Sequence, residues 1–418
     1  MKISFNTPAR RGPIIAVAAV LGLVYLAMAA SVFVASLYGE RVELKNLKRA
    51  AWLDPGNADY RDHLGRYYDL VARDPGAAVD QYKIATRLNP HSARYWFDLA
   101  SSYQVLGDTA NQAAALERAI QADATTPDVA WEAANLYLVQ GEREKALREF
   151  RVVIANDASL ANAALQFAWR IDPDVDSMLR DIVPVRADAY TGFLDLLQSK
   201  QETNGAARVW DALIQSHQAF ELPHAYDYIH YLVQHKEVDQ AVQVWQQTTS
   251  RFGLTSYLPS SSNLIVNNNF NLKVLNAGFD WQYQKQSSVT LTLDPSDFHA
   301  GRRSLLIAFD GPGIVESGIY QLVAVQPNTT YDFSGYYKTG EFEGAGGPHF
   351  TIQDMYTQAV YYESEELKDT GFWRSADGKF TTGPDCKLIV LHVRRLPAGS
   401  PMRGKLWIGD FHLTRKSS

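Results

Sequence analysis

The sequence predicts a multidomain α plus β protein, with one transmembrane helix, an α-solenoid of paired helices and then an all-β jelly-roll sandwich. Three observations predict this fold class. An uncharged apolar run lies near the N-terminus, a motif repeats about every 34 residues in the first half, and short strand-like segments fill the last third. The expected parts are a cytoplasmic tail (1–12), the transmembrane helix (13–38), the solenoid (39–255), a linker (256–262) and the sandwich (263–415).

The composition of the 418 residues is that of a folded protein, and it excludes several classes of function. Hydrophobic residues make up 46% and charged residues 21%, so most of the chain is too apolar to be disordered. The net charge of −6 is spread without long runs, and no basic stripe indicates a nucleic-acid partner. Cys386 is the single cysteine, which excludes an internal disulfide and a cysteine-rich metal site.

The first expected element is the run from Ile14 to Leu37, which holds no charged residue over 24 positions. About 20 apolar residues cross a bilayer as a helix, whereas the apolar part of a cleaved signal peptide is usually about 7–15 residues long. We therefore expect an uncleaved anchor, with cleavage near small residues such as Ala29 as the alternative. Arg10 and Arg11 directly precede the run, which favours a cytoplasmic N-terminus. The protein would then be a single-pass inner (plasma) membrane protein whose C-terminal domains are periplasmic or extracellular.

The second expected element is the solenoid, because a motif repeats with a period of 34 or 35 residues. Pro55 and Pro90 end similar turns, and Ala124 and Ala158 hold the matching places further on. A repeat of this length is typical of stacked helix pairs, in which large side chains fill the gaps that small ones leave. Other positions keep the same spacing, namely Tyr82, Leu116 and Phe150, Ala85 and Ala119, Tyr103 and Tyr137, and Gly107 and Gly141.

These positions resemble the tetratricopeptide repeat family, although Ala124 and Ala158 stand where that family expects proline. The matching packing and turn residues are Trp96, Leu99, Tyr103, Gly107, Leu116, Ala119 and Ala124, with Pro55 and Pro90 as closing prolines. The resemblance implies a concave groove that binds a protein partner; the alternative is that the groove positions only cover the surface or pack on a neighbour. Those positions are Arg94, Phe97, Ser101, Gln104, Asp128, Trp131 and Asn135.

The repeat continues more weakly toward residue 251. Trp210 and Trp245 are again 35 positions apart, but residues 171–184 interrupt the pattern. We therefore expect an irregular unit in the middle of the solenoid.

The third expected element is the sandwich. Serine, proline and asparagine in residues 256–270 break helices and mark a linker. Strand-like runs then follow, from SVTLTL at residue 288 to KLWIGDFHL at residue 405, separated by turn residues. Two-residue alternation in the last run places Trp407, Phe411 and Leu413 on one side of the strand.

The order of these runs resembles the galactose-binding-like sandwich of carbohydrate-binding modules, which opens on an Asn-rich strand and closes on a Leu-Trp-x-x-Asp strand. NLIVNNNF and LWIGDF fill these places here, and the resemblance covers residues 263–414. Family members often hold a structural calcium ion between the first and last strands. Asp410 keeps one ligand position, but Asn271 stands where a glutamate is usual, and a neutral amide weakens such a site. We expect no cofactor and no tightly bound metal, with Asp410 as a weak calcium candidate.

A sugar site combines an aromatic ring beneath the apolar face of the sugar with planar hydrogen-bonding groups around its hydroxyls. Alternation in three expected strands gives Tyr336, Gln353, His392 and Arg394 an outward orientation, and we expect them to share one face. The alternative is an ordinary solvated sheet face.

Aromatic residues near the expected loops are further candidates for stacking on a sugar. Trp281 and Tyr356 are the main ones, together with Tyr361 and Tyr362, whereas Trp373 and Trp407 are expected in the core.

No sequence motif indicates catalysis. A phosphate-binding glycine loop, a zinc-binding His-Glu-x-x-His and a Gly-x-Ser-x-Gly elbow do not occur. We therefore expect a non-enzymatic, membrane-anchored envelope scaffold without catalytic residues, whose solenoid binds a protein and whose sandwich binds glycan or protein. A role in the assembly or export of a cell-surface polysaccharide fits the resemblances. The alternative is a pure protein–protein assembly scaffold with no glycan binding.

Overall fold

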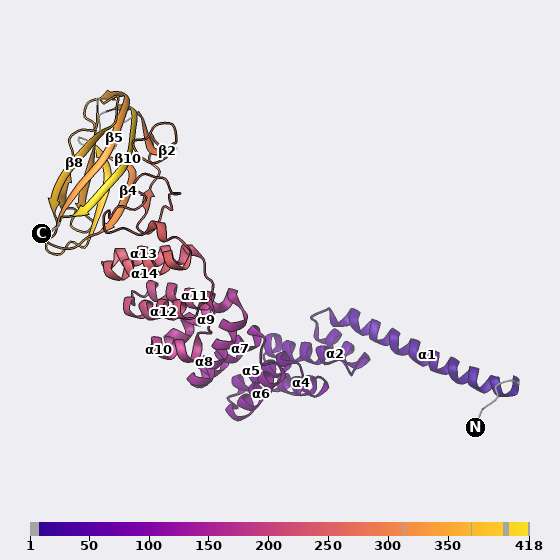
Figure 1. Ribbon diagram of the computed structural model, residues 1–418. Coiled ribbons are helices and arrows are strands. Elements are labelled where there is room, and N and C mark those ends of the chain that lie inside the picture. The colour runs from indigo at the N-terminus through magenta and orange to yellow at the C-terminus, as the bar shows by residue number, and fades with distance from the viewer. Residues whose placement is uncertain (1–7, 312, 314, 369, 396–400, 417–418) are drawn as a thin grey trace. The chain divides into compact units, whose positions relative to one another are not determined.

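The computed structural model of the chain describes residues 8–311, 313, 315–368, 370–395 and 401–416 (Figure 1). It forms two compact units, Met1–Gln218 and Ala219–Ser418. Helices make up the first unit, and two antiparallel sheets follow one helix pair in the second. The expected order of one apolar helix, a helical solenoid and a β-sandwich is thereby confirmed. Most of the expected tail, residues 1–7, lies outside the described residues.

The first unit is a row of helices in which neighbours along the chain pack against each other (Figure 1). Its elements are α1 (Pro8–Gly39), α2 (Leu44–Leu53), α3 (Ala58–Arg66), the π-helical turn η1 (Tyr67–Ala72), α4 (Pro75–Leu88), α5 (Ala93–Leu106), α6 (Thr109–Ala122), α7 (Pro127–Gln140), α8 (Arg143–Asn156), α9 (Ala158–Ile171), α10 (Val175–Ser177), the π-helical turn η2 (Met178–Ile182), α11 (Ala187–Ser199) and α12 (Thr203–Gln215).

The repeated residues act as the spacing predicts. Tyr82, Leu116 and Phe150 are at most 1% exposed and fill the gaps between helices. Gly107 and Gly141 end α5 and α7 in the left-handed conformation, with φ of 73° and 79°. Glycine adopts this conformation without a Cβ clash, and its N–H then satisfies a free carbonyl of the last helical turn. Each glycine therefore ends the first helix of a pair and allows the chain to turn into the second helix.

The predicted irregular unit is present after α9. In place of a long second helix, the chain forms the single turn α10 and then η2, a π-helical turn. Asp174 caps this segment by accepting a hydrogen bond from the Ser177 N–H at 2.7 Å. Val175, Met178 and Ile182 still point inward and are buried, so the unit keeps its core contacts without the full helix.

The second unit begins with the helices α13 (Leu222–Gln234) and α14 (Val238–Arg251) and the short turn η3 (Thr255–Tyr257). The predicted limits of solenoid, linker and sandwich remain predictions. Backbone contacts divide the chain between Gln218 and Ala219, which places this helix pair in the same unit as the sheets.

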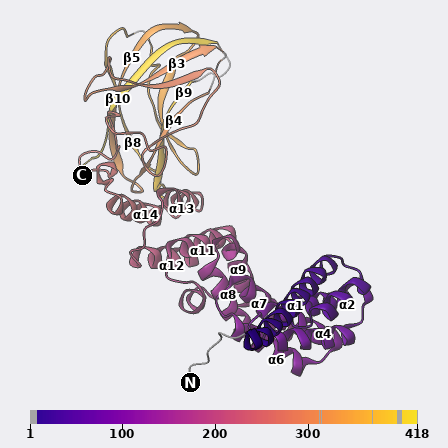
Figure 2. The same ribbon diagram turned by 90° about the vertical axis from the view of Figure 1, so that its right-hand side faces the viewer.

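Two five-stranded antiparallel sheets form the sandwich (Figure 2). The β9 sheet has the strand order β1-β4-β9-β6-β7, and the β10 sheet has the order β2-β3-β10-β5-β8. Their strands are β1 (Trp281–Tyr283), β2 (Val289–Asp294), β3 (Ser304–Gly311), β4 (Glu316–Ala324), β5 (Thr330–Gly344), β6 (Pro348–Asp354), β7 (Val360–Glu363), β8 (Arg374–Thr381), β9 (Leu388–Arg395) and β10 (Met402–Arg415).

The core of the sandwich lies between the two sheets. Alternate residues of each strand point into it, as expected for sheets with one buried face. Aromatic rings occupy its centre, where Phe270, Phe350 and Phe411 are fully buried and contact one another in pairs. The outer face of each sheet is thus left to polar and half-buried side chains, and these carry the candidate sites.

Candidate functional site

Three of the predicted sugar-contacting residues lie together on the outer face of the β9 sheet. Gln353 is on β6, and His392 and Arg394 are on the neighbouring strand β9. Leu391 and Val393 belong to the core between the sheets, so the residues that alternate with them point outward.

Glu316 of β4 joins these three residues, although no sequence pattern indicates it. Its carboxylate lies 2.6 Å from Arg394 Nε and 3.2 Å from His392 Nδ1. The Arg394 Nη1 group donates to Gln353 Oε1 at 3.2 Å. The guanidinium therefore has a fixed orientation between a carboxylate and an amide, which pre-organises it for planar hydrogen bonding.

An aromatic ring adjoins this cluster. Tyr320 pairs with His392 across β4 and β9, and both point outward. The Tyr320 hydroxyl donates to Gln282 Oε1 at 2.9 Å, and the Gln282 amide donates to the Gly278 carbonyl at 2.7 Å. The ring is half-buried, so part of its surface remains open. We call Gln282, Glu316, Tyr320, Thr351, Gln353, His392 and Arg394 the His392 surface.

Three polar atoms of the His392 surface have no hydrogen-bond partner among the described residues. Arg394 Nε has its ion pair with Glu316, which leaves His392 Nε2 and Thr351 Oγ1, on side chains that pair across β9 and β6. His392 is 6% exposed and Thr351 is 1% exposed. Buried polar groups are nearly always paired, because an unpaired one costs about 1–3 kcal/mol. Both atoms are almost fully covered, so a buried water molecule or a shift of neighbouring side chains has to supply their partners.

The expectation that Tyr336 shares this face is wrong. Tyr336 lies on β5, which belongs to the β10 sheet, whereas β6 and β9 belong to the other sheet. Its ring is covered by the imidazole of His299, with the ring centroids 3.7 Å apart and nearly parallel. A ring covered in this way offers less surface to a sugar.

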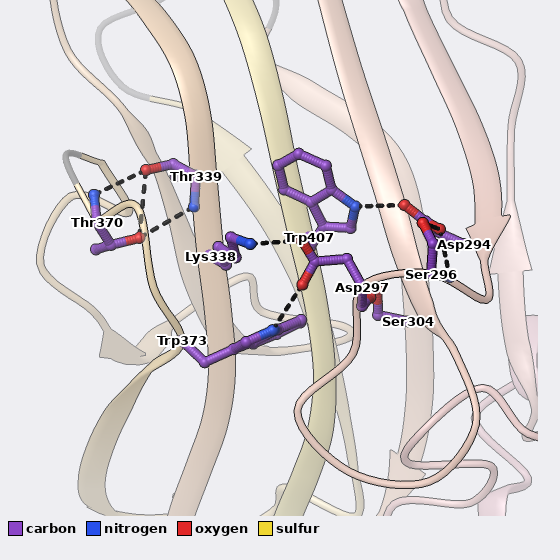
Figure 3. A network of polar contacts seen from close by, with 9 residues as sticks. All are labelled: Asp294, Ser296, Asp297, Ser304, Lys338, Thr339, Thr370, Trp373 and Trp407. Atoms are coloured by element: carbon purple, nitrogen blue, oxygen red, sulfur yellow. Dashed lines mark hydrogen bonds and ion pairs between the residues drawn. The ribbon is translucent and has the colours of Figure 1, made fainter.

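Trp373 and Trp407 were expected in the core, and this expectation is also wrong. Both are half-buried on the outer side of the β10 sheet, within the polar network of Figure 3. The Trp407 N–H donates to Asp294 at 2.7 Å, and the Trp373 N–H donates to Asp297 at 3.0 Å. Lys338 contacts the same Asp297 carboxylate at 2.5 Å and lies over the Trp407 ring. These groups satisfy one another, so the network fastens the loops to the sheet.

Trp281 and Tyr356 have structural positions. Trp281 is 1% exposed and stacks between Phe270 and Phe411 in the core, which corrects its assignment to an exposed platform. The Tyr356 hydroxyl donates to the Val233 carbonyl of α13 at 2.8 Å. The hydroxyl therefore helps to hold the helix α13 against the sheet domain.

Asp410, the weak calcium candidate, has both carboxylate oxygens engaged. One oxygen lies 2.9 Å from His299 Nδ1 and the other lies 3.0 Å from His412 Nε2. Asn271 instead accepts the Arg302 N–H at 2.8 Å. Among the described residues, no group of three or more His, Cys, Asp or Glu side chains is placed to hold a metal ion.

Several predicted groove residues of the solenoid also have partners within the chain. Arg94 contacts Asp62 at 2.5 Å, Asn135 donates to a backbone carbonyl, and Trp131 packs edge-on against Phe150. Burial of Asp62 raises the pKa of its carboxyl above the ordinary range. Phe97 is 4% exposed and belongs to the interior, which corrects its place in the groove. The remaining predicted positions are Ser101 and Asp128 (both exposed) and Gln104 (half-buried), and their role in a groove stays a prediction.

The fold is thus a jelly-roll sandwich, with a polar, aromatic-flanked outer face, that follows a solenoid of tetratricopeptide-like helix pairs. Residues 262–396 match the family described as "Carbohydrate binding domain". The chain thus carries a C-terminal carbohydrate-binding domain. No curated protein matches the sequence.

Similar solved structures fall into two groups. A carbohydrate-binding structure described as "CBM4 structure and function" is 15% identical, covering 36% of this chain and 99% of that one, with a TM-score of 0.29. The crystal structure of MamA is 20% identical, covering 41% and 85%, with a TM-score of 0.24. PilF of Pseudomonas aeruginosa is 17% identical, covering 54% and 92%, with a TM-score of 0.25.

Proposed function

We propose that the protein is a non-enzymatic scaffold of the cell envelope that binds a glycan through the His392 surface and a protein partner through its solenoid. The observation that carries the glycan part is the convergence of Glu316, Gln353, His392 and Arg394 around two unmet buried polar atoms. The family match over residues 262–396 supports the same ligand class.

Each part of the surface has a task that suits a saccharide. Arg394 and Gln353 present planar donors and acceptors to vicinal hydroxyls. The exposed part of the Tyr320 ring packs against the apolar face of a pyranose.

The anchor supports a place at a membrane. Ser31 donates to the Leu53 carbonyl at 2.7 Å, and Ala35 is fully buried, so the end of α1 is part of the folded solenoid. A signal peptide that is removed by cleavage would not contribute to the core of the solenoid. Tethering raises the effective concentration of both binding domains near a membrane-bound machine. Assembly or export of a cell-surface polysaccharide is the role that fits best.

Screening the full-length protein, solubilised in detergent, on a glycan array tests the proposal. We expect binding to a set of related saccharides. Arg394→Ala should weaken that binding by about 10- to 100-fold, because a hydrogen bond to a charged group contributes about 1.5–3 kcal/mol. The matched control is Arg403→Ala, which removes an arginine from the exposed side of β10, where it forms an ion pair with the exposed Asp310.

An array without any glycan signal would contradict the glycan part. The protein would then be a pure assembly scaffold, and its sandwich would be a protein-binding domain. Equal losses in Arg394→Ala and Arg403→Ala would show that the His392 surface is not the site.

A further inference from the structure

The exposed side of α2 carries three cations and a tryptophan. Lys45, Lys48, Arg49 and Trp52 are all exposed and recur at a spacing that places them on one face of the helix. The opposite face buries Leu47 and Ala50 in a small core with the end of α1 and with α3. This helix thus presents a cationic surface that ends in a tryptophan.

The helix α2 folds back along α1. The two helices are joined by the short turn at residues 40–43, and Ser31 of α1 hydrogen-bonds to Leu53 at the far end of α2. The Lys48–Trp52 end of α2 therefore lies beside Ser31. The turn, with Glu40 and Glu43, lies at the other end of the hairpin.

The exposure of α1 indicates where a bilayer would end. Residues 12–30 are exposed all round, and contacts with the rest of the fold begin at Ser31 and continue at Ala35 and Gly39. At 1.5 Å per residue, residues 12–30 extend over about 28 Å, which matches a hydrocarbon core of about 30 Å. Ser31 then marks the boundary of the hydrocarbon layer, and so does the neighbouring end of α2.

We propose that α2 lies in the headgroup layer of its own membrane, where Lys48 and Arg49 bind anionic phospholipid headgroups and Trp52 occupies the interface. Trp52 is 76% exposed in the protein, and tryptophan is enriched at this depth of a bilayer. Asp54 follows the helix, while Asp59 is engaged by the Tyr95 hydroxyl at 2.7 Å. The cations thus outnumber the free carboxylates at this end. The consequence is a solenoid whose first unit is fixed against the membrane surface.

The inference rests on the proposal that α1 remains as an anchor, so the test begins with that point. Full-length protein is reconstituted in nanodiscs of phosphatidylcholine alone and of phosphatidylcholine with about 30% phosphatidylglycerol. Before this reconstitution, membranes that contain the protein are extracted with carbonate, which should leave an anchored chain in the membrane. Release of the chain would overturn both the anchor and this inference.

Hydrogen exchange of the α2 amides is then compared between the two lipid mixtures. We expect about tenfold slower exchange with the anionic lipid, because each cation near such a surface contributes about 1 kcal/mol. The double variant Lys48→Gln/Arg49→Gln should lose this dependence. The control Arg143→Gln/Arg148→Gln, on the exposed face of α8, should keep it. Exchange that is indifferent to lipid charge in an inserted protein would overturn this inference alone.

A second readout locates Trp52. Lipids brominated near the headgroup should quench part of the tryptophan fluorescence, and Trp52→Phe should remove that part. This variant is expected to fold, because the indole makes few contacts within the protein. Equal quenching in the wild type and in Trp52→Phe would place α2 away from the bilayer and contradict the inference.

Discussion

A single carboxyl group, that of Asp280, should give the sandwich a distinctive pH dependence. Asp280 is fully buried beside the first strand and accepts the Leu275 N–H at 2.7 Å, but its other oxygen has no partner among the described residues. Burial raises the pKa of this carboxyl from its ordinary value of 3.8 to about 6. Between about pH 4 and pH 6, the Asp280 carboxyl is therefore protonated in the folded protein but ionised in the unfolded chain.

The sign of the effect follows from this difference in proton binding. The free energy of unfolding should decrease as the pH rises from about 4 to about 6, by on the order of 2–3 kcal/mol for this group. Asp280→Asn should remove that decrease, because the amide stays neutral and still accepts the Leu275 N–H. Urea unfolding of both proteins at pH 4, 5, 6 and 7 measures the difference. Parallel stability curves for the two proteins would contradict the assignment.

In the last strand, the sequence did not predict correctly which face of the sheet each residue occupies. Strict alternation predicted that Trp407, Phe411 and Leu413 share a side. In the structure, Phe411 and Leu413 face the core together with Ile408, and Trp407 faces outward. The pairing of β10 with β5 shifts register between Gly409 and His412, and Asp410 has a φ of 52°. A bulge adds one residue to a strand and so exchanges its two faces.

At the scale of elements, the helix pair α13–α14 and the sheets should stabilise each other. The Tyr356 hydroxyl bonds to α13, Lys387 contacts Asp239 of α14 at 2.5 Å, and the Trp245 N–H donates to the Tyr257 carbonyl at 3.1 Å. Gly278 lies so close to Trp245 that a Cβ there would meet the ring at 2.3 Å. The contact between the helix pair and the sheet domain thus combines polar bonds with close apolar packing around Trp245.

We therefore expect a fragment starting at Ala219 to be more stable than one starting at Asn263. The shorter fragment exposes the side chains that α14 covers, among them Leu322 and Phe279, which line a small apolar cavity with Trp245. Losing the burial of several large apolar side chains lowers the free energy of unfolding by about 1.5–3 kcal/mol each. Denaturant unfolding of the two fragments measures the loss. Equal midpoints would show that the sandwich folds without help from the pair.

The sequence predicted the elements far better than the pairing between them. Repeat spacing located the helix pairs, because the same packing positions recur in each one, as Leu116 and Phe150 show. Alternation told which residues of a strand share a face, and Gln353, His392 and Arg394 do lie together. It carried no information on which sheet a strand joins, so Tyr336 was grouped with the wrong partners. Glu316 gave no signal, because its role depends on long-range pairing of β4 with β9.

At the scale of the whole molecule, the chain joins three parts: an N-terminal apolar helix, a helical solenoid and a carbohydrate-binding sandwich. The solenoid and the end of α1 share a core through Ala35, Leu47 and Leu64. The end of α1 is therefore held in a fixed place on the first helices of the solenoid.

The central claim is that the outer face of the β9 sheet, and not that of the β10 sheet, binds a saccharide. Calorimetric titration of the best array ligand into the wild type, Arg394→Ala and Tyr336→Ala tests it most directly. We predict at least about tenfold weaker binding for Arg394→Ala and an unchanged dissociation constant for Tyr336→Ala. Full affinity in Arg394→Ala, or a loss confined to Tyr336→Ala, would contradict the account.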